Sequence, residues 1–134
     1  MHRAAVLALD VGGTKLAAGV ADADGKLHSF LRTATGVAEG PEAVIDRLTR
    51  LGLQALTAAG DPQIVAIGIG CGGPLDPSTG MILGPPGLPG WHDVPLGALM
   101  RDRFGVPAYV DNDATATALG EYRWGGWECA ISST

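Results

Sequence analysis

The first third of the chain alternates short apolar runs with tight turns. Residues 4–9 and 16–20 are continuously apolar, and residues 26–33 alternate more loosely after the turn DADG at residues 22–25. Apolar runs of this length that end at glycine or aspartate are typical of β-strands. The pattern therefore predicts three consecutive strands joined by tight turns.

From Pro41 the hydrophobic period lengthens to that of a helix. Apolar side chains recur on one helical stripe: Val44, Ile45, Leu48, Leu51, Ala55, Leu56 and Ala59. A proline suits the first helical turn, and Gly60 follows the last residue of the stripe. We predict a helix over residues 41–59, in which Gly52 approaches the sheet closely.

The second half of the chain alternates strands and helices around one long loop. Residues 64–69 form an apolar, β-branched run that suits a strand buried on both faces. Residues 71–95 are too rich in proline and glycine for regular structure, apart from a brief strand at residues 80–83. The remaining predicted elements are a helix over 96–104, a strand over 107–110 and a helix over 114–122.

This order of elements predicts a mixed α/β fold, in which an antiparallel meander lies beside parallel strands with crossover helices. Ligands bind to such folds at the loops that leave the carboxyl ends of the strands. Residues 10–14, 70–74 and 111–113 form three loops of this kind. We therefore expect the three loops to converge at one edge of the sheet.

The length and charge of the chain narrow the range of its partners. At 134 residues the chain has the size of one domain. A formal net charge of -5 leaves no basic surface for nucleic acid or an anionic membrane, so we expect small-molecule partners.

No apolar run approaches the ~20 residues that a membrane-spanning helix requires. Cys71 and Cys129 lack zinc-ligand or disulfide spacing, which favours reduced thiols in a cytoplasmic protein.

The segment DVGGTK, residues 10–15, is a candidate phosphate loop. It is not a Walker A sequence, because the chain returns as a strand instead of opening a helix. The backbone N–H groups of a glycine hairpin can form a concave anion site, with the Thr14 hydroxyl as a further donor. Asp10 could hold Mg²⁺ beside the phosphates. An ordinary hairpin with a capping aspartate is the alternative.

The other two loops favour a polar ligand of a different kind. Residues 68–73 spell the dinucleotide fingerprint GxGxxG, but Pro74 and Pro77 oppose the helix that this fingerprint requires. The glycines instead indicate a backbone pressed against a polar ligand. In the third loop, Asn112 can bind hydroxyls and Asp113 can take a proton from one, which suits a sugar. Helix capping is the alternative for this pair.

Taken in order, these segments resemble the N-terminal half of sugar kinases of the ROK family (repressor, open reading frame, kinase). Residues 10–15 resemble its first phosphate loop, residues 68–76 its GxGxPGPxD segment, residues 88–91 its LxGW turn and residues 110–114 its xENDA stretch. The family belongs to the actin-like, Hsp70-like and hexokinase-like ATPases, so the resemblance implies an RNase H-like lobe. That lobe covers residues 1–126, and residues 127–134 match poorly.

The resemblance implies an ATP-dependent hexose kinase of the glucokinase type, with Asp113 as the general base that accepts the proton of the attacking sugar hydroxyl. The implied sugar-binding residues are Gly73, Gly87, Asn112 and Asp113. The implied phosphate- and Mg²⁺-binding residues are Asp10, Gly12, Gly13, Thr14 and Lys15. ATP and Mg²⁺ are the implied cofactors, while the structural zinc and the second lobe of the family would lie beyond residue 134. The resemblance also leaves a homodimer as a possible assembly.

Two positions depart from the family pattern and keep other functions open. The family reads NxPN ahead of the LxGW turn, whereas Gly84 and Gly87 occupy the two asparagine positions here. A truncated or degenerate lobe that binds a sugar or responds to it without catalysis is therefore an alternative. The DNA-binding repressors of the family carry a winged helix ahead of the kinase-like part, and the first predicted strand begins too early here to leave room for one.

Overall fold

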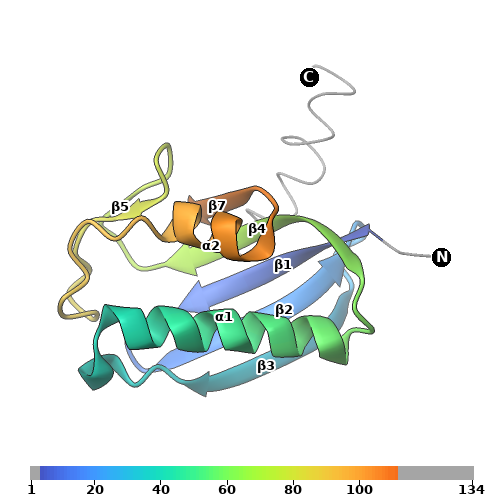
Figure 1. The fold of residues 1–134 in the computed structure, drawn as a ribbon, viewed down its shortest axis with the longest axis horizontal. Helices are drawn as coiled ribbons and strands as arrows, with labels where there is room; N and C mark the ends of the chain where they lie inside the picture. Colours follow the sequence, from blue (N-terminus) through green and yellow to red (C-terminus); the bar gives the residue numbers. More distant parts are fainter. Residues whose placement is uncertain (1–3, 112–134) are drawn as a thin grey trace.

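A five-stranded sheet forms the centre of the molecule (Figure 1). The structure is a computed structural model that describes residues 4–111. Its strands follow the order β3-β2-β1-β4-β7, with β1 (Ala4–Val11), β2 (Lys15–Asp22), β3 (Leu27–Ala34), β4 (Gln63–Cys71) and β7 (Ala108–Asp111). β1, β2 and β3 pair antiparallel, whereas β1, β4 and β7 run parallel. This is the meander beside parallel strands that the sequence predicts.

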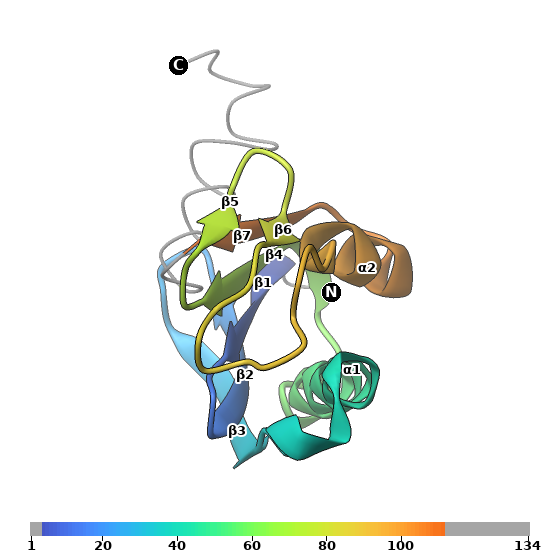
Figure 2. The ribbon, with the colours of Figure 1, turned by 90° about the vertical axis from the view of Figure 1, so that its left-hand side faces the viewer.

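The two α-helices within residues 4–111 lie on the same face of this sheet (Figure 2). α1 (Pro41–Ala58) contacts β1, β2 and β3, and α2 (Leu96–Phe104) contacts β4 and β7. Connections between parallel strands are almost always right-handed, and β1, β4 and β7 follow one another in a single direction across the sheet. Two right-handed crossovers in the same direction place their helices on one face. We call the opposite face, which neither of these two helices covers, the open face, although Val6, Ala21 and Ala66 form a small buried cluster on it.

The hydrophobic core lies between the sheet and α1. Leu7 and Leu9 of β1 are fully buried, as is Leu48 of α1. A Cβ atom added to Gly52 of α1 would lie 3.4 Å from the Cδ2 atoms of Leu7 and Leu9. It would also lie 3.0 Å from Cζ of Phe104 in α2. The predicted close approach of Gly52 to the sheet is confirmed.

Short pairings hold the long loop that follows β4. β5 (Leu75–Asp76) pairs antiparallel with β6 (Met81–Ile82), which confirms the brief strand predicted at residues 80–83. Ile82 also exchanges two backbone hydrogen bonds of 2.8 Å with Val94. Trp91 is fully buried in the core. The irregular segment is therefore held together by its own pairings and anchored to the core through the buried side chains of Ile82 and Trp91.

The predicted elements within residues 4–111 are all present, with ends that differ by one or two residues. The 3₁₀ helix η1 (Val37–Glu39) was not predicted, because three residues are too few to show a period. The helix predicted over residues 114–122 lies outside the described residues. No helix in the described part of the chain is long and apolar enough to cross a membrane.

Candidate active site

One row of paired residues crosses the whole sheet near the carboxyl end of β1. Asp10 pairs with Ala17 of β2 on one side and with Gly70 of β4 on the other. The row reaches both edges of the sheet, because Ala17 pairs with Arg32 and Gly70 pairs with Asp111. Directly paired residues project from the same face. We call this set of five residues the Asp10 row, and it lies on the open face because Asp10 alternates with the core residues of β1.

A groove of about 410 Å³ lies on this side of the sheet. The residues that line it include Asp10, Gly12, Lys15, Phe30, Arg32 and Gly72. Ala17 and Gly70, which separate the charged members of the Asp10 row, have too little side chain to fill the space above the sheet. Sites for small molecules commonly measure about 300–1,000 Å³, so the groove is large enough for part of a ligand.

The predicted convergence of the loops is confirmed for the parts that the structure describes. Asp10 of the first loop and Gly70 of the second are direct partners in adjacent strands. Asp111, which begins the third loop, is paired with Gly70 on the next strand. Asn112 and Asp113 lie outside the described residues, so their predicted roles in sugar binding and proton transfer stay predictions.

Close backbone contacts explain both glycines of the β1–β2 hairpin. The N–H of Gly12 donates to the carbonyl oxygen of Lys15 at 2.9 Å, and a Cβ added to Gly12 would lie 2.9 Å from that same oxygen. A Cβ added to Gly13 would lie 2.9 Å from the carbonyl oxygen of Gly87. Neither position accepts a larger residue without a backbone shift. The fold thus brings Gly13, a predicted phosphate-binding residue, into contact with Gly87, a predicted sugar-binding residue.

Thr35 holds this hairpin in place from the end of β3. Its buried hydroxyl donates to the carbonyl oxygen of Gly12 at 2.7 Å, and its N–H donates to the carbonyl oxygen of Thr14 at 2.9 Å. Arg47 of α1 donates to the carbonyl oxygen of Thr35 and forms an ion pair with Glu39 at 2.8 Å. Sequence analysis missed Thr35, because a single threonine after a strand does not identify a partner 23 residues away.

The two glycines at the asparagine positions have different surroundings. Gly84 has a φ of 129°, and a Cβ added there would lie 3.1 Å from Nδ1 of His92. An asparagine at this position would be strained and would require the imidazole to move. Gly87 has only the Cα of Gly13 near its Cβ position, at 3.8 Å. The departure at position 84 therefore agrees with the local backbone, whereas the backbone at position 87 leaves room for a side chain and does not itself require glycine.

The end of β4 offers an exposed stretch of backbone beside the groove. A Cβ added to Gly72 would meet nothing within 4 Å, and one added to Gly73 would meet only the backbone nitrogen of Leu75 at 3.8 Å. Burial raises the pKa of the neighbouring Cys71 thiol to about 11. The thiol is therefore protonated at neutral pH and is not a nucleophile.

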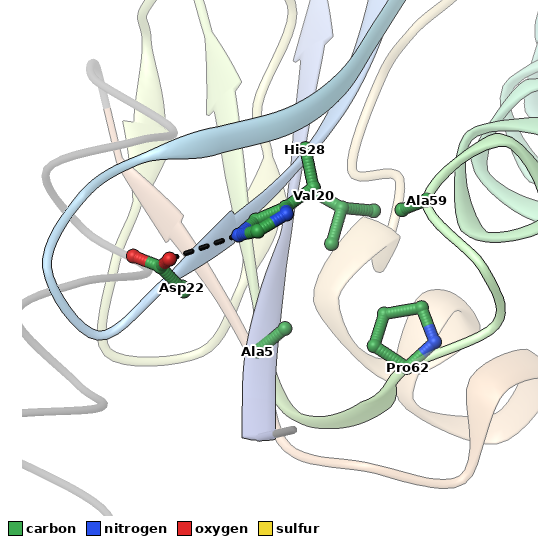
Figure 3. A pocket seen from close by; sticks show the side chains of 6 residues that line it. All are labelled: Ala5, Val20, Asp22, His28, Ala59 and Pro62. Carbon is green, nitrogen blue, oxygen red and sulfur yellow. Dashed lines mark hydrogen bonds and ion pairs between the residues drawn. The ribbon is translucent and has the colours of Figure 1, made fainter. Parts of the chain in front are cut away.

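A second pocket, of about 100 Å³, lies at the opposite end of the sheet, near the start of β1 (Figure 3). Its lining is mostly apolar and consists of Ala5, Val20, Ala59 and Pro62 together with Asp22 and His28. This volume is well below the range of about 300–1,000 Å³ that is common for ligand sites. We therefore assign the pocket no ligand.

An Asp–His pair closes one side of this smaller pocket. Asp22 Oδ2 forms a 2.8 Å hydrogen bond with His28 Nε2, and Oδ1 accepts from the N–H groups of Asp24 and Lys26 at 2.9 and 3.1 Å. The hydrogen bond with His28 is the main cause that lowers the pKa of Asp22 to about 2. The pair fixes the β2–β3 turn. Sequence analysis gave His28 no role, because the pairing depends on an irregular register between these strands.

The comparisons with known proteins agree on one family. The ROK family model matches residues 6–130. The glucokinase of Streptomyces coelicolor is 36% identical over 120 residues, which are 90% of this chain and 36% of the relative.

Two solved structures share the fold as well as the sequence. The ROK hexokinase from Thermus thermophilus is 39% identical with a TM-score of 0.74, over 89% of this chain and 38% of that one. The ROK family glucokinase from Streptomyces griseus, in complex with glucose and AMPPNP, is 35% identical with a TM-score of 0.69, over 91% of this chain and 37% of that one. The chain thus spans little more than a third of the length of these relatives. Since the family model covers nearly all of the chain and the mixed sheet matches these structures, the chain belongs to the ROK family.

Proposed function

We propose that this chain is the N-terminal lobe of an ATP-dependent sugar kinase, with residues 1–126 as the lobe. The reaction transfers the γ-phosphoryl group of ATP to a sugar hydroxyl. The observation that carries the proposal is the contact between Gly13 of the hairpin and Gly87 of the long loop, beside the groove over Asp10. The similarity to the S. coelicolor glucokinase and to the S. griseus enzyme, whose complex holds glucose and AMPPNP, supports it.

The β1–β2 hairpin binds the phosphates in this proposal. The N–H groups of Gly13 and Thr14 and the Thr14 hydroxyl provide donors, and the exposed Lys15 provides a positive charge. Gly12 shapes the turn, because its own N–H donates to the carbonyl oxygen of Lys15. Asp10 is exposed in the groove, and a carboxylate there suits Mg²⁺, which prefers oxygen ligands. When bound, Mg²⁺ neutralises charge on the transferring phosphoryl group.

The loops after β4 and β7 bind the sugar and move its proton. Gly73 and Gly87 let the backbone approach the sugar, and Asn112 binds a hydroxyl next to the reacting one. Asp113 accepts the proton of the attacking hydroxyl, as the sugar oxygen bonds to the γ-phosphorus and the bond to the ADP oxygen breaks. Asp111 in the Asp10 row supports this arrangement, because Asn112 and Asp113 follow it directly in the sequence.

The test is a coupled ADP-release assay on the full-length protein with glucose, N-acetylmannosamine, mannose and fructose. D113N should lower kcat by about 10²–10⁴-fold, because a placed general base contributes about that much. D102N, which changes an exposed aspartate of α2, should leave kcat unchanged. Near-normal turnover by D113N would remove Asp113 from this role. Absence of turnover with every sugar would contradict the kinase and favour a lobe that binds sugar without catalysis.

The proposal includes three further properties. The enzyme requires Mg²⁺, assembles as a homodimer and resides in the cytoplasm. ADP release should stop when EDTA removes the metal and return when Mg²⁺ is restored. Light scattering on the full-length protein measures the mass and so tests the dimer.

A further inference from the structure

Two positively charged side chains that line the groove have no acidic partner among the residues that the structure describes. Lys15 and Arg32 are both exposed and both border the groove. Within residues 4–111 neither forms an ion pair, whereas Arg47 and Arg103 lie 2.8 Å from Glu39 and Asp46. Unpaired cations on the wall of a concave site favour an anionic ligand.

Phe30 holds the guanidinium group of Arg32. The Arg32 Cζ atom lies 5.6 Å from the centroid of the Phe30 ring. The two residues are two positions apart on β3, so their side chains share a face of the sheet. A guanidinium group over an aromatic ring keeps its in-plane N–H donors available for a phosphate. Phe30 itself is 52% exposed and borders the groove, so the stacked pair is accessible to a ligand there.

The strand register directs this pair toward the phosphate hairpin. Arg32, Ala17 and Asp10 are successive partners across β3, β2 and β1. Adjacent strands are about 4.8 Å apart, so the Cα atoms of Arg32 and Asp10 are separated by roughly 10 Å. Only the methyl group of Ala17 lies between them in this row. Lys15 pairs with Ala34, two residues along β3 from Arg32, so the two cations are diagonal neighbours on one face with Cα atoms roughly 7–8 Å apart. A chain of phosphates that lies along this diagonal can therefore contact both cations.

We propose that Arg32, stacked on Phe30, is a further binding residue for the phosphate chain of the donor. The ligand class is a linear polyphosphate, either the triphosphate of a nucleotide or inorganic polyphosphate. The proposal rests on the proposed function for its place in phosphoryl transfer, but the binding itself can be measured on this chain.

The test is isothermal titration calorimetry of the 134-residue chain with tripolyphosphate, ATP and orthophosphate at low salt. R32Q should weaken tripolyphosphate binding by about tenfold or more, because a charge-assisted bidentate contact is lost. R32K should have an intermediate effect, since lysine keeps the charge but lacks the planar fork. R101Q is the matched control, because it removes the same charge from α2, at the opposite edge of the sheet. We expect R101Q to change the affinity by less than about twofold.

Each outcome decides the proposal. Equal affinities of R32Q and R101Q, or no binding of tripolyphosphate by the unmodified chain, would overturn it. ATP binding as tight as tripolyphosphate binding supports it with a nucleotide donor, and weaker ATP binding supports it with inorganic polyphosphate. In the full-length enzyme, an unchanged KM for the donor in R32Q would overturn this proposal and leave the kinase intact. Arg32-dependent binding without phosphoryl transfer would overturn the kinase alone.

Discussion

Gly13 and Gly72 are both glycines beside the groove, but their surroundings differ. A Cβ at position 13 would meet the carbonyl oxygen of Gly87 at 2.9 Å, whereas one at position 72 would meet nothing within 4 Å. G13A should therefore force two backbone segments apart and destabilise the protein by about 1–3 kcal/mol. G72A should be neutral or slightly stabilising, because alanine restricts the unfolded chain. Thermal denaturation measures both, and equal melting temperatures would contradict the contact between Gly13 and Gly87.

Asp22 makes the stability of the fold depend on pH. Its pKa falls from the ordinary value of 3.8 to about 2 in the folded protein, so the unfolded chain takes up the proton more readily. The stabilising contribution of Asp22 is therefore complete above the unfolded pKa and is lost as the pH falls through the folded pKa. The free energy of unfolding in urea should decline between pH 4 and pH 2 more steeply for the unmodified protein than for D22N.

The matched control for this pH dependence is D24N, in the same turn. Asp24 contributes its backbone N–H to Asp22, and this hydrogen bond does not need the Asp24 carboxylate. D24N should therefore keep the slope of the unmodified protein. If D22N keeps that slope as well, the hydrogen bond between Asp22 and His28 does not account for the pH dependence.

At the scale of elements, the hairpin depends on β3 for its shape. Thr35 bonds to both sides of the β1–β2 turn through one side-chain and one backbone hydrogen bond. T35V keeps the volume but removes the hydroxyl, so the carbonyl oxygen of Gly12 loses a donor, at about 1–3 kcal/mol. T35S should be milder, because it keeps the hydroxyl. The control is T33V, two residues earlier on β3, which should leave the urea midpoint of unfolding unchanged. A urea midpoint for T35V as high as that for T33V would contradict this role of Thr35.

Strand bounds were predictable except where polar residues continue a strand. The apolar run of β1 stops at Leu9, but the strand extends to Val11 because the backbone of Asp10 pairs on both sides. The sequence did not predict β5, because a strand of two residues is too short to show an alternation of apolar and polar positions. α1 was predictable over nearly its whole length, because its apolar stripe covers the entire helix.

At the scale of the whole molecule, the sheet order follows from the chain order and the handedness of crossovers. The candidate site was predictable only in part. The glycine loops are visible in the sequence, but the alignment of Arg32 with Asp10 depends on the register of two strand pairs. The contact between Gly13 and Gly87 joins residues 74 positions apart, and no periodicity in the sequence encodes it.

The groove of this chain is one wall of the proposed cleft. The chain covers little more than a third of the relatives that it matches. We therefore expect the 134-residue chain to release no ADP in the coupled assay, whereas the full-length protein should do so. Phosphoryl transfer depends on charge neutralisation and alignment from both sides of the phosphates, which one wall does not supply. Turnover by the isolated chain would show that a second lobe is unnecessary.

The contact between Gly13 and Gly87 has a thermodynamic consequence for a kinase built on this lobe. In the proposed kinase, a sugar that shifts the 83–90 loop would also shift the hairpin, and any resulting change in donor affinity would be matched by an equal change in sugar affinity when the donor binds. Variants of this loop selected for a new sugar should therefore show altered donor affinity as well. A mutation that changes selectivity for the acceptor sugar would then also change affinity for the phosphate donor.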